Sequence, residues 1–145
     1  MTSYKIIKGN THSDTRGELN FFNDFDMKEI VRMYEISPKN KNELRGWQGH
    51  KKEHKWFYCS KGSFTLFLSL ITHFNDENSN LPTTKILLEE KKPSIVHITG
   101  GYATAFKANE ENAKLLVFSN ATLEASIADD FRFNLEKWPV NLNNI

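Results

Sequence analysis

The chain has 145 residues and a mass of 16.8 kDa, which is the size of one domain built around a single core. Nineteen Lys and Arg balance 18 Asp and Glu, and no basic tail or acidic tract is present, which argues against nucleic acid or an anionic membrane as a partner. Hydrophobic residues make up 39% and aromatic residues 12%, which excludes global disorder. We therefore expect one domain over residues 1–145.

The single cysteine and the N-terminus both indicate the cellular compartment. Cys59 cannot form an internal disulfide and lies in the apolar run Trp56–Cys59, where a buried thiol is the ordinary interpretation. The first residues lack the apolar core of a signal peptide, and no apolar stretch approaches the roughly 20 residues of a membrane helix. These features predict a protein of the reducing cytoplasm.

Short apolar segments rich in β-branched or aromatic residues run along the chain and predict strands. They are Tyr4–Lys8, Glu18–Phe22, Ile30–Ile36, Lys55–Ser60, Ser63–Ile71, Thr84–Glu89, Ser94–Ile98, Tyr102–Lys107 and Lys114–Ser119. The alternation is clearest after Ser63, where Phe64, Leu66 and Leu68 share one face and Phe67 is the exception. Short turns rich in Gly, Pro and Asn separate the segments and favour antiparallel pairing.

Helix is expected only in single turns, near Asp24–Glu29 and Thr122–Ser126. His73–Thr83 is predicted to be a long polar excursion, and Asn141–Ile145 a frayed end. About nine short strands in one domain leave a sandwich, a jelly roll or a small barrel, and the pattern alone does not choose between them.

The segment Leu44–Tyr58 combines two histidines, several cations and large aromatic residues. If Trp47–Lys51 is extended, Gln48 and His50 project from the same face, and the next turn brings His54 or Lys55 back toward them. A convergent polar site is one interpretation. The other is a sheet edge protected by charged side chains.

Several motifs occur in the order typical of one enzyme family: Gly17–Phe21, Arg32–Tyr34, Arg45–Lys51 and Gly62–Phe64. The chain thereby resembles the cupin nucleotide-sugar 3,4-ketoisomerases, from about Asp14 to Phe133. More distantly it resembles the deoxysugar 3,5-epimerases, through Asp14–Gly17, Ile98–Ala103 and the position of Lys55 before Gly62. The resemblance implies an all-β double-stranded β-helix, the cupin jelly roll, assembled as a homodimer. It also implies a thymidine-diphosphate-linked 4-keto-6-deoxyhexose substrate and a place in deoxysugar and polysaccharide biosynthesis.

One position departs from both families. The ketoisomerase motif has two histidines separated by one residue, and this sequence keeps the second as His50 but has Gln48 in place of the first. The catalytic histidine of the epimerases also falls at Gln48, and the tyrosine that serves them as the catalytic acid aligns with or near Val117. Epimerisation by the usual pair of residues is therefore not expected.

The resemblance and the chemistry of isomerisation together suggest roles for individual residues. A base near neutral pKa and donors to a developing oxyanion are required, which favours His50 as base and Tyr34 as a hydroxyl donor or relay. The expected substrate-binding residues are Arg16 and Arg45 for the diphosphate, Trp47 for stacking, and Gln48, His54 and Lys55 as polar contacts.

Each role has a plain structural alternative. Tyr34 fits a core tyrosine with a satisfied hydroxyl. Trp47 fits barrel packing, and Arg16 fits a turn ion pair with Asp14. His54 fits a charged loop equally well.

No metal and no cofactor are expected. Many cupins hold a metal through His-x-His, a later Glu and a distant His, whereas here Gln48, His50 and His54 offer two imidazoles and an amide, and the distant position is Thr104. Two other functions stay open: a degenerate cupin that binds a sugar nucleotide or a protein without turnover, and an isomerase that works through His50 alone.

Overall fold

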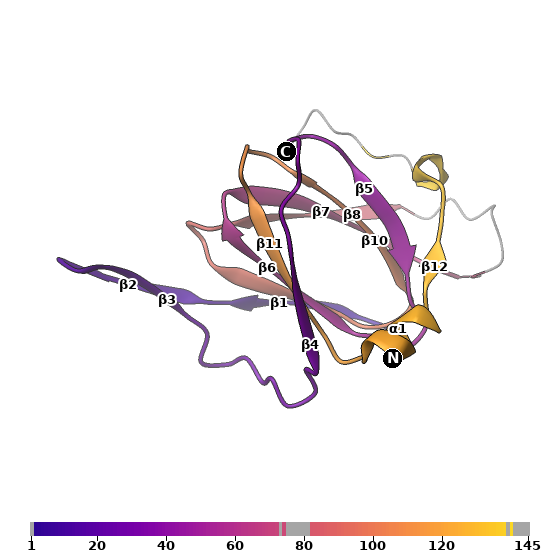
Figure 1. Cartoon of the computed structure of the whole chain (residues 1–145), viewed down its shortest axis with the longest axis horizontal. Helices are drawn as coiled ribbons and strands as arrows, with labels where there is room; N and C mark the ends of the chain where they lie inside the picture. The colour runs from indigo at the N-terminus through magenta and orange to yellow at the C-terminus, as the bar shows by residue number, and fades with distance from the viewer. Residues whose placement is uncertain (1, 73, 75–81, 139, 141–145) are drawn as a thin grey trace.

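The computed structural model describes residues 2–72, 74, 82–138 and 140. Its strands form two five-stranded antiparallel sheets and a separate hairpin (Figure 1). In spatial order the first sheet is β1 (Tyr4–Lys8), β9 (Ser94–Ile98), β6 (Lys55–Lys61), β11 (Lys114–Ser119) and β4 (Arg32–Ile36). The second is β12 (Phe131–Arg132), β5 (Arg45–Gly49), β10 (Tyr102–Ala108), β7 (Ser63–Leu70) and β8 (Thr83–Glu89). The predicted all-β jelly roll is confirmed.

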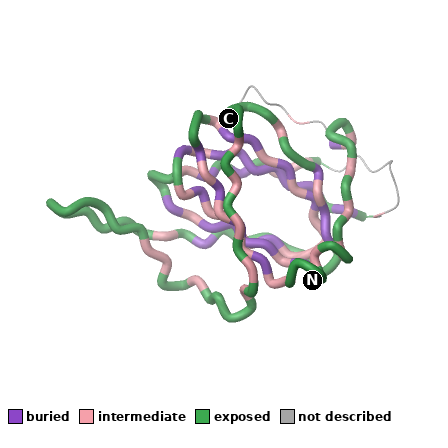
Figure 2. The backbone as a smooth tube through the Cα atoms, in the orientation of Figure 1, coloured by how far each residue is buried: buried purple, intermediate pink, exposed green. Residues whose placement is uncertain are grey.

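The remaining elements lie outside these two sheets. β2 (Asn10–Asp14) and β3 (Gly17–Phe21) form a hairpin that extends away from the barrel, with nearly every residue exposed (Figures 1 and 2). Helix α1 (Leu123–Ile127) and the 3-10 helix η1 (Leu135–Lys137) belong to the C-terminal segment. This segment passes one end of the barrel and then the outer face of the second sheet.

The main core fills the space between the sheets, because alternate residues of each strand point inward. It contains Phe57, Cys59, Phe64, Leu66, Leu68, Leu88, Val96, Leu115 and Val117, all at most 2% exposed. Phe67 points the other way and is also buried, because Trp47, Ile71 and Trp138 cover that outer face of the second sheet. Phe67 therefore breaks the alternation of β7 because this strand is buried on both faces.

The predicted strands all occur, with small shifts at their ends. The structure adds β2, β5 and β12, and β4 begins at Arg32 rather than at Ile30. Helix α1 confirms the predicted C-terminal turn, and Thr122 caps it by accepting a hydrogen bond from the backbone N–H of Ala125 at 3.2 Å. Most of the predicted excursion at His73–Thr83, and the chain end at Asn141–Ile145, lie outside the described residues.

The helical turn expected at Asp24–Glu29 is wrong. The segment holds only a hydrogen-bonded turn, in which Ile30 donates to the carbonyl of Met27, while Asp26 accepts from the N–H of Lys28. Phe25 and Ile30 pack against the outer face of the first sheet. The segment is therefore held by this side-chain packing rather than by the backbone hydrogen bonds of a helix.

Two further observations concern membrane-spanning helices and the single cysteine. No helix among the described residues is long and apolar enough to cross a membrane. Cys59 is buried in the main core, and burial raises the pKa of its thiol to about 12. Cys59 is therefore an inert packing residue, as the sequence predicted.

Candidate active site

A cavity of about 540 Å³ opens between the two sheets. Its walls come from the inner faces of β4, β5, β6 and β10, and α1 and β12 close one side. The charged residues of its described lining are Arg32, Arg45, Lys55, Arg132, Glu35 and Asp130. Four cations against two carboxylates leave a net charge of +2 on the wall. Such a wall suits a ligand with about two negative charges.

Strand periodicity explains how the chain builds this wall. Arg32 and Tyr34 lie two residues apart on β4, and Lys55 and Phe57 two residues apart on β6, so each pair faces the same side of its strand. Toward the opposite end of the barrel the inward positions become apolar, as at Cys59. One end of the barrel is therefore polar and the other is packed.

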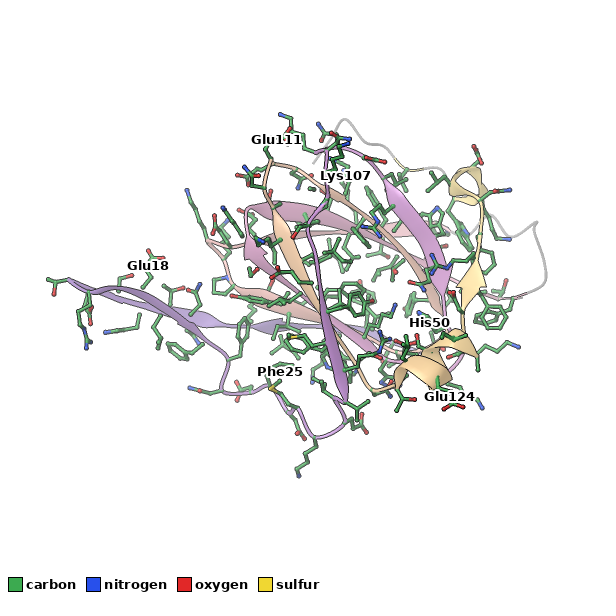
Figure 3. All side chains as sticks on the ribbon, viewed as in Figure 1. Glu18, Phe25, His50, Lys107, Glu111 and Glu124 are labelled. Carbon is green, nitrogen blue, oxygen red and sulfur yellow. The ribbon has the colours of Figure 1, made fainter. Side chains whose placement is uncertain are left out.

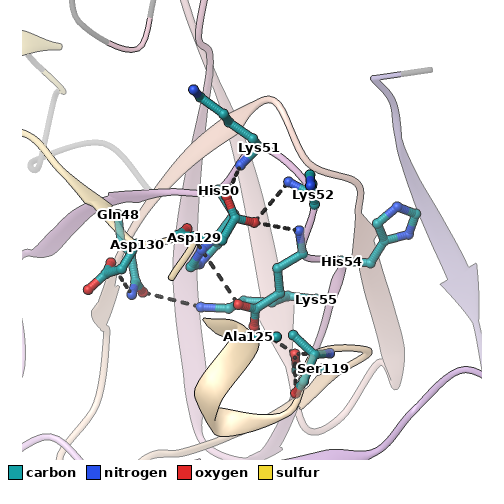
Figure 4. A network of polar contacts seen from close by, with 12 residues as sticks. Gln48, His50, Lys51, Lys52, His54, Lys55, Ser119, Ala125, Asp129 and Asp130 are labelled. Carbon is teal, nitrogen blue, oxygen red and sulfur yellow. Dashed lines mark hydrogen bonds and ion pairs between the residues drawn. The ribbon is translucent and has the colours of Figure 1, made fainter. Parts of the chain in front are cut away.

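A chain of hydrogen bonds crosses the polar end (Figure 4). Lys55 Nζ donates to Gln48 Oε1 at 3.2 Å, and Gln48 Nε2 donates to Asp130 Oδ1 at 2.9 Å. Arg132 Nε also donates to Asp130 Oδ1, at 2.9 Å. Gln48 thus joins the first sheet, through Lys55, to the C-terminal segment.

Tyr34 and Lys55 are the protonated donors of the cavity. Burial raises the pKa of Tyr34 to about 12, although the neighbouring Arg32 opposes part of this effect. Burial lowers the pKa of Lys55 to about 8, with Glu53 opposing the shift. Lys55 Nζ lies 5.8 Å from the centre of the Tyr34 ring. At neutral pH both groups carry their protons and can donate to an oxyanion.

His50 lies behind the cavity rather than in its wall. It is 5% exposed and lines a second space of about 10 Å³, which is enough for one water molecule. Gln48, Lys55, Phe57 and Thr104 line both spaces and so form the wall between them. The imidazole is therefore one side chain away from the larger cavity.

The protonation state of His50 follows from its contacts. Nδ1 lies 2.7 Å from the backbone carbonyl oxygen of Asp129, which can only accept, so Nδ1 carries the proton. Nε2 is left with the lone pair, buried and without a hydrogen-bond partner in the described part of the chain. Burial, and next the charge of Lys55, lower the pKa of His50 below its usual value. The imidazole is thus a neutral base at neutral pH.

Glu53 is a buried carboxylate beneath His50, with a side chain 1% exposed. Burial favours its neutral form, but the hydrogen bond from the Ser119 hydroxyl and the nearby ammonium of Lys55 are among the contacts that leave its pKa below the usual value. Its Oε2 accepts from Ser119 Oγ at 2.6 Å and from Arg32 Nη2 at 3.2 Å, and its Oε1 lies 3.5 Å from His50 Nδ1. Oε1 makes no hydrogen bond within the described residues, so it lies close to the neutral imidazole without being hydrogen-bonded to it.

Of the predicted site residues, Tyr34, Arg45, Gln48 and Lys55 meet in the cavity wall, with the Arg45 guanidinium 5.7 Å from the centre of the Phe106 ring. Residues that the sequence analysis assigned to one site therefore do meet in the structure, although they come from three different strands.

Three predicted residues lie elsewhere. Trp47 is fully buried on the outer face of the second sheet, 5.2 Å from Trp138 between ring centres, so it packs the fold instead of stacking on a ligand. His54 contacts His97 at 3.2 Å outside the barrel. Arg16 is on the hairpin, 86% exposed and paired with Asp14 at 2.6 Å. Figure 3 shows this hairpin, marked by Glu18, projecting away from the end of the barrel that holds His50.

Sequence reasoning missed several groups. Arg32 had a usable signal, because it precedes Tyr34 by two residues on the same strand. Arg132, Asp129 and Asp130 follow α1, and no local pattern indicated that this segment folds back onto β5. Glu53 stood in a charged run where a solvated side chain was the simpler interpretation.

No group of three or more His, Cys, Asp or Glu side chains suited to a metal occurs among the residues with described positions. The absence of a bound metal stays a prediction, which elemental analysis tests.

Comparison with known proteins gives the chain its family. The FdtA family, described as WxcM-like, C-terminal, matches residues 2–136. The chain belongs to this family. No curated protein sequence matches it significantly. The resemblance to sugar 3,4-ketoisomerases inferred from the motifs is confirmed by this match and by the solved structures of similar fold.

Three solved structures illustrate the similarity of the FdtA-family chain. The WlaRB TDP-quinovose 3,4-ketoisomerase from Campylobacter jejuni is 26% identical with a TM-score of 0.65, over 92% of this chain and 95% of that one. A mutant of the 3,4-ketoisomerase QdtA from Thermoanaerobacterium thermosaccharolyticum, in complex with TDP-4-keto-6-deoxyglucose, is 23% identical (TM-score 0.69; 90% and 87%). The 3'-monoepimerase ChmJ from Streptomyces bikiniensis, with dTDP-quinovose, is 15% identical (TM-score 0.73; 90% and 69%).

Proposed function

We propose that this protein is a nucleotide-sugar isomerase that converts a 4-keto-6-deoxyhexose, linked to a nucleoside diphosphate, into its 3-keto isomer. The observation that carries the proposal is the polar end of the barrel. There a wall with a net charge of +2 holds two protonated donors, and a neutral imidazole lies directly behind it. The related enzymes of known structure include 3,4-ketoisomerases of TDP-linked sugars.

The charge of the wall supports a diphosphate-linked substrate. Arg45 and Arg132 present guanidinium groups, which bind phosphate oxygens with two parallel hydrogen bonds. A diphosphate ester carries about two negative charges, which matches the net charge of the wall. Leu123 and Ile127 of α1 add an exposed apolar strip beside these cations, 62% and 70% exposed.

The proposed reaction moves a carbonyl between neighbouring carbons through an enediol. A base removes the C3 proton while the C4 oxygen gains negative charge. The C4 oxygen takes up a proton to give the enediol, and return of a proton to C4 with loss of the O3 proton then gives the 3-keto sugar, so two protons leave, two return and the composition is unchanged. His50 Nε2 is the base, and Lys55 and Tyr34 donate to the oxyanion. This assignment requires the reacting carbons to lie at the wall shared by the two cavities.

Deuterium exchange tests the function. The protein is incubated with TDP-4-keto-6-deoxyglucose in deuterated buffer, and we expect deuterium at C4 of a 3-keto product and, through the reverse reaction, at C3 of the 4-keto substrate. His50→Asn keeps a polar side chain of similar shape but lacks a base, so exchange should cease. His12→Asn, on the exposed hairpin, is the control. Measurable binding without exchange, across several nucleotide sugars, would contradict the isomerase and support a binding protein.

The assembly and location form part of the proposal. We propose a homodimer, because the β2–β3 hairpin projects with Leu19 60% exposed, and Ile6 on the edge strand β1 is 48% exposed. Sedimentation equilibrium tests this, with Leu19→Asp expected to favour the monomer and Leu135→Asp, on η1, expected to leave the mass unchanged. The lone buried Cys59 supports a reducing cytoplasm.

A further inference from the structure

The turn that follows His50 is fastened to the C-terminal segment by a single carboxylate (Figure 4). Asp129, just beyond α1, accepts three backbone N–H groups: Lys51 at 2.8 Å, Lys52 at 2.9 Å and Glu53 at 2.9 Å. Three donors on one ionised carboxylate are charge-assisted hydrogen bonds, about twice as strong as neutral ones. The turn between β5 and β6 therefore takes its shape from a residue 76 to 78 positions away.

The backbone of the same residue holds the imidazole. The carbonyl oxygen of Asp129 lies 2.7 Å from His50 Nδ1, which fixes the proton on that nitrogen. From the other side, Gly101 donates its N–H to the carbonyl of His50 at 2.7 Å. Asp129 thus contacts the His50 ring through its backbone carbonyl and the three following residues through its carboxylate.

We propose that Asp129 is a positioning residue, which sets the tautomer and the orientation of His50 so that the basic Nε2 faces the wall of the substrate cavity. It acts through His50 and touches no substrate. The inference rests on the proposed function only in taking His50 as the base. Its contact with the imidazole stands whatever the substrate is.

A residue that only stabilises the fold would give a different experimental result. Its loss would lower the free energy of unfolding but leave the His50 tautomer and the kcat of the folded protein unchanged. Loss of a positioning residue changes the tautomer and the kcat as well. Misplacing a reacting group by about 1 Å costs roughly 100-fold in rate, so the two roles are separable by kinetics.

The test uses Asp129→Ala and the milder Asp129→Asn, in which the amide keeps one acceptor oxygen. The matched control is Asp26→Asn, an exposed aspartate that accepts the backbone N–H of Lys28 at 3.0 Å. Each folded protein is assayed for kcat and KM. The imidazole tautomer of His50 is read without substrate from its ring nitrogen NMR shifts.

We expect the wild type to show the Nδ1–H tautomer. Asp129→Ala keeps the backbone carbonyl but loses the three hydrogen bonds that hold residue 129 against the turn, so this carbonyl should move away from Nδ1 and the variant should show a mixture. Its kcat should fall by about 10- to 100-fold with KM changed less than about threefold, and Asp129→Asn should lie between the two. An unchanged tautomer and unchanged kcat in the folded variants would overturn the inference. A shifted tautomer in a protein that turns over no nucleotide sugar would support it while refuting the proposed function.

Discussion

Lys55 should give the enzyme an upper pH limit inside the working range. Because burial lowers the pKa of this ammonium to about 8, roughly nine-tenths of it is protonated at pH 7 and roughly one-tenth at pH 9. If the ammonium stabilises the oxyanion, kcat should fall about tenfold between these values. On the acidic side His50 must be neutral, and its lowered pKa places the lower limit below about 6.5, the usual imidazole value.

Replacing Lys55 with Met separates this effect from folding. Methionine has a similar length and removes a buried charge, so stability should be kept. Loss of one donor to an oxyanion costs about 100- to 1,000-fold in kcat, and the decline above pH 8 should disappear. The assay is the initial rate of isomerisation from pH 5 to 10, with Lys61→Met, exposed at the end of the same strand, as control. A Lys55→Met enzyme within twofold of wild type, or one that keeps the decline, would refute the role.

Three further predictions concern the frame of the site. Gln48→His keeps a donor for the neighbouring carboxylate and restores the family's imidazole, so proton exchange should equal or exceed wild type; a tenfold loss would contradict this. Trp138→Ala removes a 1% exposed indole that packs on Trp47, and urea unfolding should show a loss of about 3–5 kcal/mol, whereas less than about 1 would count against this packing role. Gly100→Ala would drive a methyl group into the carbonyl of Lys51, and thermal unfolding should show a loss of about 1–3 kcal/mol; an unchanged midpoint would mean that the turn yields freely.

The fold could be predicted from strand periodicity, and half of the site from the family resemblance and from the turn that follows His50. Those two features suggested Tyr34 and Lys55, and the strand period explains why both side chains point into the barrel from β4 and β6. The same rule could have excluded one expectation. If Gln48 faces the cavity, its neighbour Trp47 must face the opposite side of the strand, where it packs.

The rest of the site depends on contacts that no local pattern records. Asp129 and Asp130 reach β5 across about 80 residues, and the segment around them is polar and short. The hairpin strand β2 escaped prediction because Asn10–Asp14 contains no apolar residue to alternate. Its pairing with β3 is set by the partner strand and the Gly17 turn.

Gln48 separates two opposite charges that would otherwise be free to pair. An amide between Lys55 and Asp130 binds both, yet it carries no charge and does not titrate. If the two groups were in direct contact, the Asp130 carboxylate would raise the pKa of Lys55 and neutralise the positive potential of its ammonium. With a dipole interposed, the ammonium keeps its positive potential for an incoming anion and can still exchange its proton near pH 8. The residue that departs from the family's histidine thus acts as an electrostatic spacer, which tunes the acid beside it.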